Sequence, residues 1–378
     1  MNWERRVHLA AHPLAYPLVR GIARLGPVVR VPRVGVVVSG AGPAREVLTD
    51  PVRFTKTGPG SPADLWTPVV GPTVLLNMEG EAHAALRRKL SGLFTPRSVA
   101  ALCDRVAQEP MRALRDDLAA GRAVDLVAVV RDLVGAVICG LVGLDPAEAV
   151  RAHAAGAAIT AMVRLGRTGL TPGQVRHSRA ALERLTRPAS AAYAAGDPAT
   201  VPGRMRELGL TEPEALGAVA AFVLTGTETL VSHVPRMVAL LHDTGRLDRL
   251  AEDRAGVGAA IAESLRFTVP SPVMLRSVAV DTAVGGVRVR AGERVVIATI
   301  SAAKDFGPFD PDRPHSPAVR QLWFGAGPHF CLGMPLAEAE IRAVLDAVLD
   351  SAPLVVVDRR AARRVLIPGY ERLVLRRG

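Results

Sequence analysis

The segment Phe324-Gly325-Ala326-Gly327-Pro328-His329-Phe330-Cys331-Leu332-Gly333 places one cysteine in a glycine-punctuated turn. Apolar residues recur at helical spacing from Met334 to Leu349, so we expect Cys331 at or just before a helix N-terminus. Free N–H groups and the helix dipole favour an anionic sulfur there. Gly325, Gly327 and Gly333 allow backbone conformations and close approaches that a side chain would block. Because a cysteine thiolate is an axial ligand of oxygen-activating haem iron, the turn indicates oxygen chemistry.

The same segment resembles the haem-binding signature FGxGxHxCxG of cytochromes P450 and fills each of its fixed positions. The resemblance implies a mainly α fold with small β-sheets, a triangular α-rich prism in which haem b lies between a distal and a proximal helix. Cys331 would ligate the iron, and Phe324, Gly325 and Gly333 would contact the cofactor. The resemblance runs from about Pro13 to the C-terminus, so we expect a single domain over residues 1–378.

Composition adds weaker constraints. The chain has 47 basic and 36 acidic residues and a net charge of +11, but only Lys56, Lys89 and Lys304 are lysines. It contains no basic run of five or more and no aromatic-interleaved basic patch, so a solvated arginine-rich surface is favoured over a nucleic-acid binder. A docking patch for an acidic protein remains the alternative.

Targeting and redox signals point to a reducing cytoplasmic setting. Cys103, Cys139 and Cys331 lie far apart without CxxC spacing, which argues against a disulfide framework or a structural zinc site. The N-terminal segment is interrupted by charges and prolines, unlike a signal peptide or membrane anchor. The longest apolar run, Ala215 to Leu224, is shorter than the roughly 20 residues that span a bilayer.

Local patterns predict helices with short hairpins. Amphipathic helical spacing covers Ala82 to about Leu144, with helix starts near Glu79 and Pro96. Leu170 to Gly203 should contain two or more connected helices. Hairpins are expected at three places: Val28 to Val31 with Val34 to Val38, around Gly285-Gly286, and around Pro368-Gly369.

A long distal helix is predicted from a capping box, in which Thr211 is the N-cap and Glu214 the N3 residue. It should run to about Leu241. Within it, Thr225-Gly226-Thr227-Glu228-Thr229 is similar to the family motif A/G-G-x-D/E-T. The resemblance implies that Thr229 holds water beside the reacting oxygen and that Glu228 supplies protons. An ordinary helix threonine, bonded back to a carbonyl one turn earlier, is the alternative for Thr229.

Two features of this helix depart from the usual pattern. Thr225 stands where the family usually has Ala or Gly, so it should narrow the cavity or offer a substrate a hydrogen bond. Pro235 falls inside the helix, where it removes a backbone hydrogen bond and should kink it.

A charged pair in an apolar segment points to a structural network. Glu263 and Arg266 are three residues apart in IAESLRF, and such a pair must satisfy its charges mutually if it is buried. It resembles the family's ExxR, and Arg313 matches the third member of that network. An ordinary surface pair is the alternative for an isolated ExxR.

The resemblance also assigns the edge of the cofactor. Haem carries two propionates, for which arginine is the best-suited cation. His83 and Arg87 match the family's HxxxR, and Arg276 and His329 match two further propionate contacts. Each of the four taken singly could be an ordinary surface or core residue.

The resemblance implies a monooxygenase that uses O2 and electrons from a separate ferredoxin and reductase, which would dock near Arg88, Lys89 and Arg97. Its substrate would be a hydrophobic small molecule, such as a natural-product intermediate. C–C coupling, desaturation or another oxidation without oxygen insertion is an alternative, as is a non-catalytic haem-thiolate sensor. The pocket residues implied by family position are Trp66, Leu76, Ala218, Ala221, Phe222, Thr225, Val273, Leu275 and Ile367.

Overall fold

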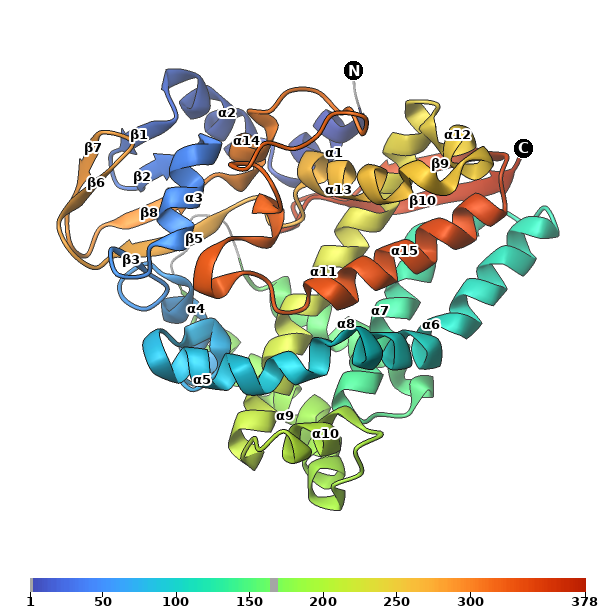
Figure 1. The fold of residues 1–378 in the computed structure, drawn as a ribbon, viewed down its shortest axis with the longest axis horizontal. Helices are drawn as coiled ribbons and strands as arrows, with labels where there is room; N and C mark the ends of the chain where they lie inside the picture. The colour runs from blue at the N-terminus through green and yellow to red at the C-terminus, as the bar shows by residue number, and fades with distance from the viewer. Residues whose placement is uncertain (1–2, 164–168) are drawn as a thin grey trace.

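The computed structural model describes residues 3–163 and 169–378, and Figure 1 shows a helix-rich molecule with a roughly triangular outline. In this view β1–β3 and β5–β8 lie on the left, β9 and β10 lie at the upper right, and α9 and α10 form the lower corner. The α-helices are α1 (Trp3–Ala11), α2 (Ala15–Leu25), α3 (Ala41–Thr49), α4 (Pro62–Val70), α5 (Gly80–Ser91), α6 (Pro96–Ala119), α7 (Leu126–Val142), α8 (Ala149–Thr160), α9 (Pro172–Ala195), α10 (Val201–Glu207), α11 (Glu212–Asp243), α12 (Arg246–Glu252), α13 (Val257–Thr268), α14 (Thr299–Lys304) and α15 (Met334–Asp350).

Three small sheets complete the fold. The largest has the order β1-β2-β8-β5-β3; β4-β10-β9 and β6-β7 are the others. In the largest sheet β2 pairs in parallel with β8, and the other neighbours are antiparallel. The strands are β1 (Val28–Val31), β2 (Gly35–Val38), β3 (Phe54–Thr55), β4 (Val124–Asp125), β5 (Met274–Val278), β6 (Thr282–Val284), β7 (Val287–Val289), β8 (Arg294–Ile297), β9 (Leu354–Ala361) and β10 (Tyr370–Arg377). The mainly α class with small sheets is confirmed.

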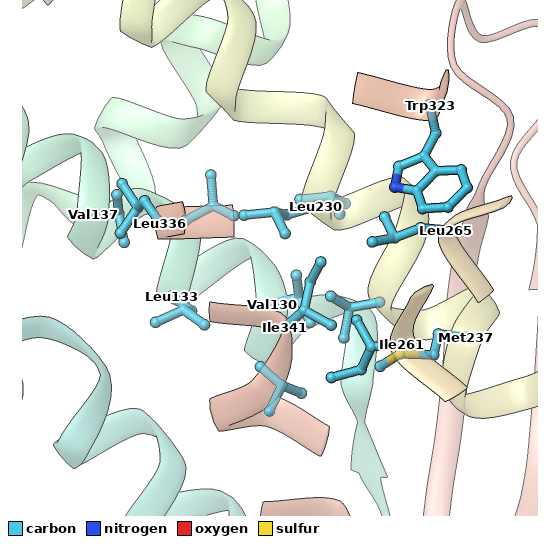
Figure 2. Close-up of a cluster of buried hydrophobic side chains, with 14 of the residues drawn as sticks. Val130, Leu133, Val137, Leu230, Met237, Ile261, Leu265, Trp323, Leu336 and Ile341 are labelled. Carbon is cyan, nitrogen blue, oxygen red and sulfur yellow. The ribbon is translucent and has the colours of Figure 1, made fainter. Parts of the chain in front are cut away.

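The core is organised around α11, which runs through the interior (Figure 1). It is long and apolar enough to span a membrane by composition, but most of that apolar stretch is buried inside the protein, as expected of a core helix. Figure 2 shows side chains from α7, α11, α13 and α15 meeting in one buried cluster. Its labelled members are Val130, Leu133, Val137, Leu230, Met237, Ile261, Leu265, Trp323, Leu336 and Ile341.

Most local expectations hold. The three hairpins form as β1–β2, β6–β7 and β9–β10. The capping box of α11 is complete, because Thr211 Oγ1 accepts from the N–H of Glu214 and the Glu214 carboxylate accepts from the N–H of Thr211. The segment after Leu170 forms two helices, α9 and α10, and α9 continues through Pro188 because its packing against α10 and α11 supports it.

Candidate active site

The cysteine loop crosses from a short 3₁₀ turn (Gly327–His329) to α15, three residues beyond Cys331. The N–H of Cys331 donates to the carbonyl of Phe324 over 2.9 Å, which closes the loop. Gly327 has φ +67°, and a Cβ there would lie 2.6 Å from the carbonyl oxygen of Leu48, so only glycine fits. Gly333 has φ −82°, an angle open to any residue, so the expectation that it needs a glycine conformation is wrong.

Two opposing effects act on the pKa of the Cys331 thiol. Burial raises its pKa, whereas hydrogen bonds from the N–H groups of Gly333 and Met334 and the charge of Arg87 act in the opposite direction. The helix N-terminus therefore contributes as expected, but burial outweighs it. A metal ion bound to the sulfur would take the place of the proton, since a coordinating thiol is deprotonated outright.

Cys331 and Thr229 line one cavity of about 610 Å³ between α11 and α15. Seven of the nine expected substrate residues line it too: Trp66, Leu76, Ala221, Phe222, Thr225, Val273 and Leu275. Two expectations are wrong. Ala218 is buried in the core one turn before Ala221, and Ile367, in the loop between β9 and β10, does not reach the cavity wall.

The three threonines of the distal motif differ in how their hydroxyls are used. Thr225 Oγ1 donates to the carbonyl of Ala221 over 2.8 Å, and Thr227 Oγ1 donates to that of Val223 over 2.5 Å. Among the residues that the structure describes, Thr229 Oγ1 has no hydrogen-bond partner, although Thr229 lines the cavity. The back-bonded alternative for Thr229 is therefore not what the structure contains.

Glu228 faces away from this cavity, toward α8. Its Oε1 lies 3.9 Å from Nε2 of His153, and within the described chain that buried nitrogen has no hydrogen-bond partner. Burial raises the pKa of Glu228, with the charge of Arg131 opposing. Burial also lowers the pKa of His153 to about 4, so its imidazole is neutral at pH 7. His153 could not be found from sequence, because it lies on α8, far from Glu228 along the chain.

The four residues expected at the cofactor's edge all line the cavity. Arg87 on α5 donates to the carbonyl of Phe330 over 2.6 Å and so also fixes the cysteine loop. The rings of His83 and His329 lie 4.3 Å apart, centroid to centroid. Burial lowers the pKa of His83 to about 4, and burial also lowers that of Arg276 to about 10.

Sequence reasoning missed two charged residues at this edge, Lys56 and Glu79. Glu79 accepts from Nε2 of His329 over 2.7 Å and from the N–H of Lys56 over 2.5 Å. Burial would raise the pKa of Glu79, but these hydrogen bonds lower it to about 2, so the group is an anion. Lys56 lines the cavity itself. Lys56 lies two residues after Phe54, in a stretch without any recognisable functional motif, so the sequence did not single it out.

The ExxR pair is buried as expected, with the guanidinium of Arg266 donating to both carboxylate oxygens of Glu263 over 2.6 Å. The third member is not Arg313. Nε2 of His315 donates to Glu263 over 2.8 Å, whereas Arg313 donates to the carbonyl of Pro308 and stacks on the Phe306 ring. Arg313 is displaced because Arg266 already occupies the carboxylate's other side and turns toward the same loop carbonyls.

These residues together fit a haem. The cavity offers a thiol near one wall, cations at one edge and aliphatic side chains from α7, α11 and α15 elsewhere. Such a donor set matches an iron ligand and two propionates.

Comparisons with known proteins support this geometry. The family model for cytochrome P450 matches residues 256–360. The erythromycin C-12 hydroxylase of Saccharopolyspora erythraea is 30% identical over 80% of this chain and 78% of its own length. The chain belongs to the cytochrome P450 family. The mycinamicin IV hydroxylase/epoxidase of Micromonospora griseorubida is 31% identical over 74% of this P450 and 72% of its own length.

The fold comparison agrees. A solved structure of a mutant of P450 EryK in complex with erythromycin B has a TM-score of 0.82 and 26% identity, covering 98% of this chain and 97% of the other. This P450 is accordingly a monooxygenase whose cofactor is haem with a cysteine thiolate as axial ligand.

Proposed function

We propose that this P450 hydroxylates a hydrophobic small molecule in natural-product biosynthesis, with Cys331 as the iron ligand and Thr229 and Glu228 as catalytic residues. The observation that carries the proposal is that Thr229 lines the cavity that also contains the Cys331 thiol, with no hydrogen-bond partner for its hydroxyl among the described residues. Bound haem supplies dioxygen activation and C–H oxidation.

The chain's own residues would prepare this chemistry. Thr229 Oγ1 can donate a hydrogen bond to, or accept one from, a water molecule in the cavity, because no main-chain carbonyl within the described chain competes for it. Burial raises the pKa of Glu228. Its carboxyl lies near His153 and next to Thr229 in the chain, so it can take up a proton on the α8 side of the helix and supply it toward Thr229. His83, Arg87, Arg276 and His329 would bind the propionates.

The substrate class is inferred from the cavity wall. Beyond the charged edge, the wall is made largely of aliphatic and aromatic side chains, including Trp66, Phe222 and Leu275. Such a wall gains affinity from apolar area and offers few polar contacts. Two relatives are named for hydroxylating erythromycin and mycinamicin compounds, which supports a natural-product substrate of this kind.

The proposed electron donor is a separate ferredoxin with its reductase, in the cytoplasm. Arg88 and Arg97 are exposed. Arg88 lies on α5 directly after Arg87, whose guanidinium reaches the cysteine loop, and Arg97 opens α6 shortly after Phe94, which lies near Gly333. Lys89 contributes less, because its Nζ lies 3.1 Å from the Glu214 carboxylate. An acidic partner docked there should deliver electrons more slowly as ionic strength rises.

The test is a spectroscopic screen of the purified haem protein, starting with erythromycin B and mycinamicin IV, followed by turnover with a surrogate ferredoxin and reductase. For any compound that shifts the haem spectrum, we expect Thr229→Ala to bind it normally but to release peroxide in place of product. Thr225→Ala is the matched control, because Thr225 lines the same cavity with its hydroxyl already bonded.

Coupled turnover by Thr229→Ala would overturn the role of its hydroxyl. A product heavier by one oxygen atom would distinguish hydroxylation from coupling or desaturation. Spectral shifts without any electron uptake would favour a sensor.

A further inference from the structure

Lys56 is one of only three lysines in the chain, and it is half-buried where it lines the cavity. Within the described residues its Nζ has neither a hydrogen bond nor an ion pair. Burial lowers the pKa of Lys56 to about 7, with Arg276 adding to the effect. An unpaired buried ammonium is costly unless a ligand partners it.

The strand pairing brings Lys56 close to another cation. In the antiparallel pair of β3 and β5, Thr55 lies opposite Ser277, and Lys56 and Arg276 each adjoin this last pair of the two strands. The charge of Arg276 acts on Lys56 and disfavours its protonated form, since like charges repel. A shared anion between them would turn this repulsion into attraction.

Glu79 cannot be that anion alone. Its carboxylate oxygens already accept from the N–H of Lys56, the hydroxyl of Thr55 and the imidazole of His329. The charges of Arg276 and Arg87 disfavour the protonated form of Lys56, and the charge of Glu79 favours it. Cationic side chains therefore outnumber the Glu79 carboxylate at this edge, which suits an anionic ligand.

We propose that Lys56 Nζ binds a haem propionate, as a cofactor-binding residue beside Arg276. The inference rests on the proposed haem site. Lys56 also interacts electrostatically with Cys331, which places it along the cofactor space. The same ammonium could bind a substrate carboxylate by the same chemistry, so the experiment must separate the two sources.

The experiment measures the rate of haem transfer from the ferric holoprotein to excess apomyoglobin. Because hydrogen bonds to charged groups are strong, we expect Lys56→Met to release haem about ten- to a hundredfold faster than wild type. Lys56→Arg, which keeps the charge, should stay within about threefold of wild type. The matched control is Lys304→Met, because Lys304 is also half-buried but lies outside the cavity, beside the Phe267 ring.

A wild-type rate of haem transfer in Lys56→Met would overturn the proposal. Binding of dodecanoate, a carboxylate probe for the substrate site, is measured on the same variant. If Lys56→Met loses dodecanoate binding while its haem-transfer rate is unchanged, Lys56 binds a substrate carboxylate instead. Equal acceleration by Lys304→Met would also overturn it, since the effect would then reflect general stability. Lys56→Gln serves as a second neutral variant if Lys56→Met does not fold. A wild-type protein without a thiolate-type haem spectrum would instead refute the proposed function.

Discussion

Glu228 and His153 form an acid–base pair whose two members come from different helices. The 3.9 Å between Oε1 and Nε2 leaves room for a small adjustment to bring them into hydrogen-bonding contact. Burial raises the pKa of Glu228, so its carboxyl takes up a proton more readily than an exposed glutamate does.

We expect Glu228→Gln to slow ligand-dependent oxygen consumption by about 100-fold or more, because the amide keeps the shape but cannot transfer a proton. The spectral shift on ligand binding should stay unchanged. Asp132→Asn is a control, since that acid lies on the exposed side of α7. Wild-type oxygen consumption in Glu228→Gln would show that protons take another route.

The buried network around Glu263 connects α13 to the loop before the cysteine. Burial would raise the pKa of Glu263, but hydrogen bonds from Arg266, the N–H of Asp310 and His315 lower it. The Glu263 carboxylate thus joins α13, the backbone at Asp310 and the His315 side chain.

We expect His315→Phe to lower the free energy of unfolding by about 1–3 kcal/mol, because one oxygen of a buried carboxylate loses a donor while the ring packing is kept. Arg313→Met should cost less than about 1 kcal/mol, since its stem still covers Phe306. Denaturant unfolding of the holoprotein measures both. A larger loss of stability in Arg313→Met than in His315→Phe would show that Arg313, and not His315, is the third member of the Glu263 network.

Elements set by neighbouring residues were predictable from sequence, and contacts between distant segments were not. The capping box of α11 joins Thr211 and Glu214 within one turn, so spacing alone identifies it. The Glu79–His329 contact joins residues 250 positions apart, and it exists only because α5 packs beside the cysteine loop. His315 was missed for a related reason, because the family pattern assigns Arg313 by position and packing decides which side chain reaches Glu263.

At the scale of the whole molecule, one buried carboxyl should make the protein less stable as the pH rises from mildly acidic to mildly basic. Glu340 on α15 is buried, and burial raises its pKa from 4.5 to about 8. The folded state therefore holds this proton more tightly than the unfolded state. The stability it contributes is fully present below about pH 4.5 and is lost as the pH rises through 8.

We expect the free energy of unfolding to fall by up to about 5 kcal/mol from this group between pH 4.5 and 8.5. Glu340→Gln should remove that slope, because the amide does not ionise. Thermal or denaturant unfolding of both proteins across the range measures the difference. A wild-type slope in the variant would contradict the assignment to Glu340.

The most direct test of the account is the absorption spectrum of the reduced protein with carbon monoxide. We predict the red-shifted Soret band of a thiolate-ligated haem in the wild type and its loss in Cys331→Ser, with Cys103→Ser as the matched control. A Cys331→Ser variant that keeps the wild-type band would contradict the account, because the iron ligand would then be a different group.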